Sequence, residues 1–258
     1  MRERVMGFEP RWIHSLIIAR TSELGGSGKG DKRLRNPPVK CWHSSFRRAA
    51  AMVNLMRKIY VLTFVTMDGV MQGPGGPEED TSGGFRHGGW TVGYFDDFLA
   101  KEMGKEMGHK FDLLLGRRTY DIFASYWPHV NEPGADLINN ATKYVATHRP
   151  LTTDWKRTVR LEGDVVEAIR KLKKESGPEI QVHGSGTLIQ TLLKHDLVDE
   201  FWLKIFPVTI GSGRKLFADE TRYAGFSLVE SSASPSGVII AKYKPAGEVK
   251  SGSFARPT

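Results

Sequence analysis

The chain has 258 residues, and 40% of them are hydrophobic, which is enough for one large α/β domain or two small ones. No apolar run approaches the roughly 20 residues needed to cross a bilayer, so we expect no membrane-spanning helix. Cys41 is the single cysteine. An intramolecular disulfide is therefore excluded, and we expect a reducing, cytoplasmic location.

The net charge of +8 is distributed unevenly along the chain. Residues 1–55 carry 11 Lys and Arg against 4 Asp and Glu, whereas residues 56–258 carry 26 against 25. Because the larger part is almost neutral, nucleic acid is not expected as its partner. We interpret residues 1–55 as a basic extension, more typical of disorder than of polyanion binding, and Met56 as a candidate natural start.

Beyond Met56, segments of strand and helix character alternate. Strands are predicted at 57–66, 111–115, 142–147, 179–183, 199–209, 225–232 and 237–244, and helices at 95–108, 118–126, 164–175 and 187–194. The last two strands are joined around Pro235 as a hairpin. The alternation followed by a hairpin predicts an α/β fold with a mostly parallel sheet and an antiparallel edge. We expect one domain over 56–245 and a flexible tail over 246–258.

Gly116-Arg-Arg-Thr-Tyr120 lies where a predicted strand runs into a predicted helix. A helix start gathers unpaired N–H groups and positive partial charge, which suit an anionic ligand. Arg117 and Arg118 add planar guanidinium groups that match phosphate oxygens. The alternative is a simple strand-turn-helix with solvated arginines.

Two further loops follow predicted strands. His183-Gly-Ser-Gly-Thr187 has two glycines separated by one residue, which lets a backbone approach closely where a helix begins. Thr147-His-Arg149 offers hydroxyl, imidazole and guanidinium groups. Each loop alone could be only a tight turn or a solvated loop. Because ligands bind at the carboxyl ends of strands in open α/β sheets, the three loops together predict one anion-binding edge.

In this order, the motifs resemble the dihydrofolate reductase-like superfamily. The closer resemblance is to the C-terminal reductase domain of the riboflavin-biosynthesis deaminase-reductase and its stand-alone relatives, over about residues 56–245. It rests on Thr66-Met-Asp-Gly-Val70, Gly116-Arg-Arg-Thr-Tyr120, Val145-Ala-Thr-His-Arg149, His183-Gly-Ser-Gly-Thr-Leu-Ile189, Val198-Asp-Glu-Phe-Trp-Leu-Lys-Ile-Phe-Pro-Val208 and Gly211-Ser-Gly-Arg-Lys-Leu-Phe217. The resemblance implies a three-layer dihydrofolate reductase-like fold. A preceding deaminase domain is not expected, because residues 1–55 lack its zinc-binding pattern.

The resemblance also implies NADPH as the cofactor. The implied cofactor-binding residues are Gly116, Arg117, Arg118 and Thr119 at the phosphates, Thr147, His148 and Arg149 around the adenosine 2′-phosphate, and Gly184, Ser185, Gly186, Thr187 and Leu188 at the diphosphate. The cofactor supplies the hydride, so a proton donor is the main chemical group to seek in the protein.

In dihydrofolate reductases an acid on the first helix fills that role, and the predicted helix here offers Asp96 and Asp97. At about 100° per residue, Asp96 lies nearer the apolar face, where burial would raise its pKa and help it donate a proton. Asp97 lies on the opposite side and is a candidate for substrate binding. The alternative is that both acids cap the first turn of the helix.

Two further candidates lie before that helix. By the resemblance, Asp68 begins a loop over the nicotinamide and is a second catalytic candidate, although it could equally be a turn residue. Trp90 could stack on a flat substrate, or could simply be a core or surface tryptophan. Since no His-x-His or His-Glu-x-x-His pair occurs, no metal site is expected.

The resemblance implies an NADPH-dependent reductase of a small heterocyclic substrate, similar to 5-amino-6-(5-phosphoribosylamino)uracil reductase of riboflavin biosynthesis. The alternatives are a dihydrofolate reductase-type activity and a non-catalytic nucleotide-binding protein of the same fold. A homodimer formed through the sheet edge is also implied.

Overall fold

The computed structural model describes residues 56–131, 133–217, 219, 221 and 223–254. The predicted basic extension, residues 1–55 with Cys41, lies outside these residues. Among the helices that the structure describes, none is long and apolar enough to cross a membrane.

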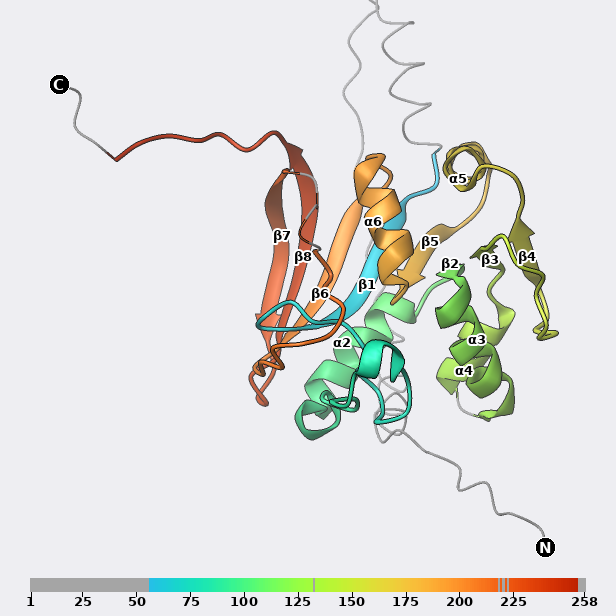
Figure 1. Ribbon diagram of the computed structural model, residues 1–258, viewed down its shortest axis with the longest axis horizontal. Coiled ribbons are helices and arrows are strands. Elements are labelled where there is room, and N and C mark those ends of the chain that lie inside the picture. The colour runs from blue at the N-terminus through green and yellow to red at the C-terminus, as the bar shows by residue number, and fades with distance from the viewer. Residues whose placement is uncertain (1–55, 132, 218, 220, 222, 255–258) are drawn as a thin grey trace, which may run out of the picture.

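An eight-stranded sheet forms the centre of the molecule (Figure 1). Its strands are β1 (Ile59–Thr66), β2 (Phe111–Gly116), β3 (Lys143–Ala146), β4 (Thr158–Leu161), β5 (Glu179–His183), β6 (Glu200–Phe206), β7 (Gly225–Ala233) and β8 (Ile239–Gly247), in the order β4-β3-β2-β5-β1-β6-β8-β7. Strands β1 to β6 pair parallel, whereas β8 pairs antiparallel with both β6 and β7. The predicted mostly parallel sheet with an antiparallel end is confirmed.

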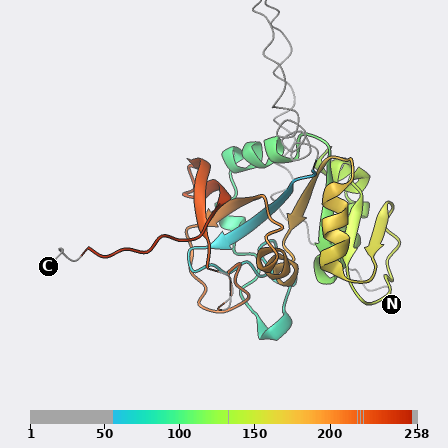
Figure 2. The same cartoon turned by 90° about the horizontal axis from the view of Figure 1, so that it is seen from above.

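Helices cover both faces of this sheet. They are α2 (Asp97–Met107), α3 (Arg117–Tyr126), α4 (Pro133–Asn140), α5 (Val165–Lys174) and α6 (Gly186–Lys194), with short 3₁₀ turns at Ser82–Gly84, Val92–Tyr94 and Trp127–His129. Helices α2, α3 and α4 contribute to the apolar clusters on one face, and α5 and α6 to the cluster on the other. Figure 2 shows α2 and α6 on opposite sides of the strands. The predicted three-layer arrangement is therefore confirmed.

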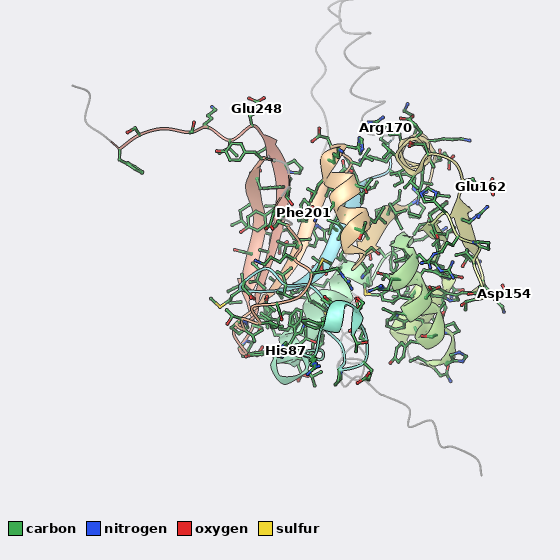
Figure 3. All side chains as sticks on the ribbon, viewed as in Figure 1. His87, Asp154, Glu162, Arg170, Phe201 and Glu248 are labelled. Carbon is green, nitrogen blue, oxygen red and sulfur yellow. The ribbon has the colours of Figure 1, made fainter. Side chains whose placement is uncertain are left out.

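Alternate residues of β1 enter the two apolar layers. Ile59, Val61 and Val65 pack in the cluster under α5 and α6, whereas Phe64 packs in the cluster beside α2. A strand buried on both faces reads as a continuous apolar run, which is why this strand was visible in the sequence. Figure 3 shows Phe201 of β6 inside the molecule, where it is 1% exposed, while Arg170 of α5 projects from its surface.

Two elements, α4 and β4, were not predicted. Helix α4 has eight residues and includes Gly and Asn, which are weak helix formers, so its stability comes from packing of Ala135 and Ile138 against Trp127. Strand β4 has four residues at the sheet edge, and only Leu161 is buried. Both elements depend on tertiary partners, and neither has a local pattern strong enough to be recognised.

The predicted terminal hairpin is present. Ser234 N–H donates to the Val238 carbonyl at 2.9 Å, and Gly237 takes a φ of +87° in the turn between β7 and β8. Strand β8 extends to Gly247, two residues beyond the expected domain end. Residues 248–254 then run away from the sheet (Figures 1 and 2).

Candidate active site

A cavity of about 1170 Å³ opens at the carboxyl ends of β1, β2 and β5. This volume is somewhat larger than the usual range for small-molecule sites, which is about 300–1,000 Å³. Ten of the predicted cofactor-binding residues line it: Gly116, Arg117, Arg118, Thr119, His148, Gly184, Ser185, Gly186, Thr187 and Leu188. Three segments that are far apart in the sequence, at 116–119, 148 and 184–188, thus line one cavity.

The chain reverses its winding direction at this cavity. Strands β2 and β5 are neighbours, but α3 leaves β2 towards one face of the sheet and α6 leaves β5 towards the other. Ligands of open α/β sheets bind in the crevice that such a reversal creates. The position therefore matches the strand-end site expected from the sequence.

Hydrogen bonds join the two loops at this point. The Gly116 N–H donates to Ser185 Oγ at 3.0 Å, and the Ser185 N–H donates to Thr119 Oγ1 at 3.0 Å. Gly184 has a φ of +53° and Ser185 a φ of 62°, so the backbone turns through the left-handed region. A Cβ on Gly184 would lie in ordinary van der Waals contact with Thr119 Oγ1, at 3.4 Å. Glycine is favoured at 184 because of its positive φ.

The starts of α3 and α6 both border the cavity. No described side chain caps either helix by a hydrogen bond, so their first N–H groups have no such partner. Two helix starts with this property, side by side, favour binding of an anionic group.

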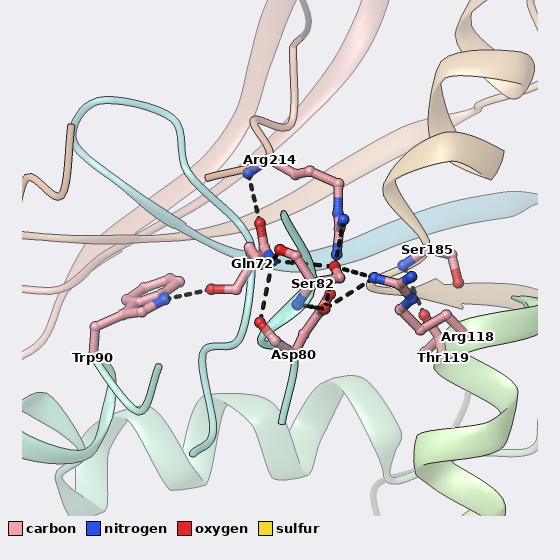
Figure 4. Close-up of polar contacts among 8 residues, drawn as sticks. All are labelled: Gln72, Asp80, Ser82, Trp90, Arg118, Thr119, Ser185 and Arg214. Carbon is pink, nitrogen blue, oxygen red and sulfur yellow. Dashed lines mark hydrogen bonds and ion pairs between the residues drawn. The ribbon is translucent and has the colours of Figure 1, made fainter. Parts of the chain in front are cut away.

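The two adjacent arginines of the opening motif have different partners. Arg117 donates from Nε to the Asp121 carboxylate at 2.8 Å, and from its terminal nitrogens to the Pro150 carbonyl and to Thr152. It therefore ties α3 to the segment before β4. Arg118 instead points over the cavity and donates to Asp80 at 2.9 Å (Figure 4).

Of the third predicted loop, only one residue lines the cavity. His148 does so, whereas Thr147 is buried and its Oγ1 accepts from the Arg149 N–H at 3.1 Å. Arg149 is exposed beside it. The hydroxyl of Thr147 thus shapes the turn, and the two basic side chains remain at the surface next to the cavity.

Asp96 lies outside the cavity lining, at the N-cap of α2. Its carboxylate accepts from the Leu99 N–H at 2.8 Å and from the Ser236 N–H at 3.0 Å. Burial acts to raise the pKa of Asp96, but these hydrogen bonds outweigh it and hold the pKa below its usual value. The expected rise in pKa is therefore wrong, and the geometry is that of a helix cap. Asp97 is the exposed first residue of α2 and does not line the cavity.

Asp68 and Trp90 also lie outside the cavity lining. Asp68 accepts hydrogen bonds from the Thr66 hydroxyl and from the N–H groups of Ile210 and Gly211, and these bonds hold its pKa below the usual range. Trp90 donates from Nε1 to the Gln72 carbonyl at 2.8 Å (Figure 4). Both side chains hold loops in place, and their proposed roles in catalysis and stacking remain predictions.

The inner part of the cavity contains an ion pair that the sequence analysis missed. Lys204 of β6 donates to Oε2 of Glu106 on α2, and the two side chains are 2% and 4% exposed. No described residue donates a hydrogen bond to the other carboxylate oxygen, Oε1. Both residues line the cavity, together with apolar side chains such as Phe64, Met103 and Phe123.

A sequence signal for this pair existed. Lys204 interrupts the otherwise apolar run Phe201-Trp-Leu-Lys-Ile-Phe206, and Glu106 follows Met103 by three residues on the buried face of α2. A charge at a core position of a strand or helix requires a partner. The pattern shows that each residue needs a partner, but it does not show that they are partners of one another.

His183 lies at the same inner end and has a defined tautomer. Gln181 Nε2 donates to the Glu106 carbonyl and to Glu179, so Gln181 Oε1 faces His183 Nε2 at 3.0 Å and can only accept. The His183 proton therefore lies on Nε2, and Nδ1 keeps its lone pair. Burial, with the nearby Lys204 charge, lowers the pKa of His183 to about 3, so the ring is neutral.

The fold and cavity define an α/β protein with a mostly parallel sheet and a cavity at the carboxyl edge of that sheet. The chain belongs to the RibD C-terminal domain family, whose model matches residues 57–240.

Similar proteins share much of the described chain. The uncharacterized protein YyaP of Bacillus subtilis (strain 168) is 29% identical over 190 residues, which cover 71% of this chain and 92% of YyaP. YwjB of the same organism is 28% identical over 112 residues, covering 42% of this chain and 59% of YwjB. The crystal structure of a putative riboflavin biosynthesis protein from Shewanella sp. PV-4 aligns with a TM-score of 0.52 and 19% identity, covering 73% of this chain and 98% of that one. At that identity the structural likeness supports the fold alone.

Proposed function

We propose that this protein is an NADPH-dependent reductase of a small heterocyclic substrate, related in reaction type to 5-amino-6-(5-phosphoribosylamino)uracil reductase. The observation that carries the proposal is the reciprocal pair of hydrogen bonds, Gly116 to Ser185 and Ser185 to Thr119, where α3 and α6 begin on opposite faces. A diphosphate needs such a convergence of helix starts and glycine-rich backbone. Membership of the RibD C-terminal domain family supports the redox class.

The residues at the cavity fit a dinucleotide. A Cβ on Gly116 would lie 3.6 Å from Ser185, and one on Gly186 would lie 3.4 Å from Met71, so the glycines keep the space beside both helix starts open. In this proposal, residues 116–119 and 184–188 hold the diphosphate. Arg149 supplies positive charge and His148 an imidazole hydrogen-bonding group for a 2′-phosphate, which is the group that distinguishes NADPH from NADH. Once bound, the nicotinamide ring supplies the hydride.

The inner cavity would then hold the group to be reduced. Addition of a hydride to the carbon of a C=N or C=O bond leaves negative charge on the heteroatom, which must take up one proton. Lys204 Nζ is the donor inside the cavity that fits this task, and Glu106 fixes its position. The apolar neighbours Phe64, Met103 and Phe123 exclude water and strengthen this interaction. Lys204 thus replaces Asp96 and Asp68 as our candidate proton donor.

Equilibrium binding tests the cofactor half of the proposal. Tryptophan fluorescence should be quenched by NADPH at lower concentration than by NADH. Gly184→Ala should raise the Kd for NADPH at least about tenfold, a loss of about 1.4 kcal/mol, because alanine is strained at this positive φ and the loop backbone must shift. Gly247→Ala is the matched control, since Gly247 also has a positive φ of 84° but lies at the end of β8. The proposal fails if neither nucleotide binds at millimolar concentration.

A turnover screen tests the catalytic half. Consumption of NADPH is measured with three sets of candidate substrates, namely the phosphoribosylamino-pyrimidine, dihydrofolate and a metabolite library. The double variant Lys204→Met with Glu106→Leu, which leaves no unpaired buried charge, should keep NADPH affinity and lose turnover. Turnover of dihydrofolate alone would support the alternative dihydrofolate reductase activity, and NADPH binding without any turnover would support a non-catalytic nucleotide-binding protein.

Association through the sheet edge is a separate proposal. Strand β7 is one of the two edge strands, and Leu228 and Val229 are exposed on it. Light scattering coupled to size-exclusion chromatography decides between monomer and homodimer.

A further inference from the structure

Two arginines from distant parts of the chain converge at the cavity mouth. Arg118, the second residue of α3, donates to Asp80 Oδ1 at 2.9 Å and to the Ser82 hydroxyl. Arg214 donates to Asp80 Oδ2 and, at 2.8 Å, to Ser82 Oγ. Figure 4 shows the two guanidinium groups on either side of Asp80 and Ser82. One carboxylate and one hydroxyl therefore hold two cations together.

A buried amide fixes the backbone around this cluster. Gln72 is 5% exposed, and its Nε2 donates to the carbonyls of Asp80 and Ser82 at 3.1 and 2.9 Å. Its Oε1 accepts from the Arg214 N–H at 3.0 Å. The Gln72 side chain thus joins segment 72–82 to the loop that carries Arg214. This fixes the position of Asp80 and Ser82 relative to Arg214.

The charges at this point do not balance. Two guanidinium groups face one carboxylate, and the side chains of Arg118 and Arg214 remain 55% and 43% exposed while that of Asp80 is 13% exposed. Burial acts to raise the pKa of Asp80, but hydrogen bonds from Ser82 and Arg214 outweigh it and hold the pKa below its usual value. Asp80 is therefore an anion at neutral pH, and within this hydrogen-bonded cluster two guanidinium groups share its single negative charge.

The arrangement matches a phosphate more closely than it matches a carboxylate. Two guanidinium groups and a hydroxyl provide more hydrogen-bond donors than the two oxygens of one carboxylate can accept. A phosphate has three terminal oxygens and up to two negative charges, so it fits this set of donors better. Asp80, Arg118 and Arg214 all line the same cavity as Thr119 and Ser185. An anion entering between α3 and α6 would meet these arginines.

We propose that Arg118, Arg214 and Ser82 form a binding site for a phosphate or diphosphate group, and that the Asp80 carboxylate competes with that group for the site. The proposal rests on the proposed function only for the source of the phosphate, which is either the nucleotide or a phosphorylated substrate. Since Asp80 and Gln72 also hold segment 72–82, binding at this site releases that segment from α3. Binding of the phosphate group therefore favours an open cavity mouth.

Binding to three variants tests this site. The probes are NADPH and inorganic pyrophosphate for a diphosphate, and ribose 5-phosphate for a phosphate monoester. Asp80→Asn removes the competing charge and should lower the Kd of the preferred probe by about tenfold, within the usual range of coupling between two ligands of one site. Arg214→Gln should raise that Kd by about the same factor. Glu78→Gln, which removes a charge from the same cavity wall without a described bond to either arginine, should change it little.

A second measurement separates this site from a purely structural bridge. Saturating probe should increase hydrogen exchange at residues 72–82 of the wild type, and Asp80→Asn should show that increase without probe. If Asp80 only holds the loop, Asp80→Asn lowers the melting temperature and leaves the Kd unchanged or raised, which overturns the proposal. Equal NADPH binding by all variants would remove this site and leave the proposed function intact. If pyrophosphate or ribose 5-phosphate binds but NADPH does not, the phosphate site is supported and the proposed function fails.

Discussion

Replacing Lys204 by methionine should destabilise the protein far more than an ordinary surface substitution. The Lys204 and Glu106 side chains are 2% and 4% exposed, so the substitution leaves a carboxylate buried without its counter-charge. Breaking a buried pair in this way costs about 3–5 kcal/mol. For a domain of this size, the loss corresponds to a melting temperature lower by about 10 °C.

The double variant Lys204→Met with Glu106→Leu should behave differently. With both charges removed, no ion remains unpaired, and stability should return to within about 1 kcal/mol of the wild type or exceed it. Urea unfolding followed by circular dichroism gives both free energies of unfolding. Lys242→Met is the matched control, because Lys242 pairs with the exposed Glu230 and should cost only about 0–1 kcal/mol. A Lys204→Met variant as stable as the wild type would refute the buried-pair reasoning.

Three further predictions concern the helix cap, the neutral histidine and the nucleotide preference. Asp96→Ala should cost about 0.5–2 kcal/mol in urea unfolding with unchanged NADPH affinity, because it removes the cap of α2; a loss of turnover at unchanged stability would instead restore Asp96 as the proton donor. The folded-state pKa of His183 is lowered from 6.5 to about 3, so acid favours the unfolded chain, and the wild type should lose up to about 2 kcal/mol more than His183→Asn between about pH 6.5 and 5. Parallel pH curves for the two proteins would show that the ring is not held neutral. Arg149→Ala should reduce the preference for NADPH over NADH by about tenfold, or about 1.4 kcal/mol, measured by fluorescence titration; an unchanged ratio would exclude Arg149 from 2′-phosphate recognition.

The nucleotide side of the site was largely predictable from sequence. Gly116 ends β2 and the residues from Gly184 to Leu188 directly follow β5, and the direction of a parallel strand fixes where its end lies. The direction in which each side chain points was harder to predict from the sequence. Arg117 and Arg118 are adjacent and chemically identical, yet one is tied to Asp121 and the other faces Asp80, because successive residues of a helix point about 100° apart.

The substrate side was not predictable in the same way. The helical position of Asp96 suggested a buried acid, but the helix begins one residue later and Asp96 caps it. Glu106 and Lys204 are separated by 98 positions in the sequence and meet only because β6 lies beside β1 under α2. No local pattern encodes such a contact, since it depends on strand order.

The sequence by itself determined the alternation of elements, the parallel sheet with its terminal hairpin and the three strand-end loops, because hydrophobic period and glycine placement are local properties. Only the tertiary structure decided which side chains share the cavity. Strand order and the reversal between β2 and β5 brought Thr119 to Ser185, Lys204 to Glu106, and Arg118 and Arg214 to one carboxylate. These contacts join residues far apart in the chain, and their geometry follows from how the layers pack.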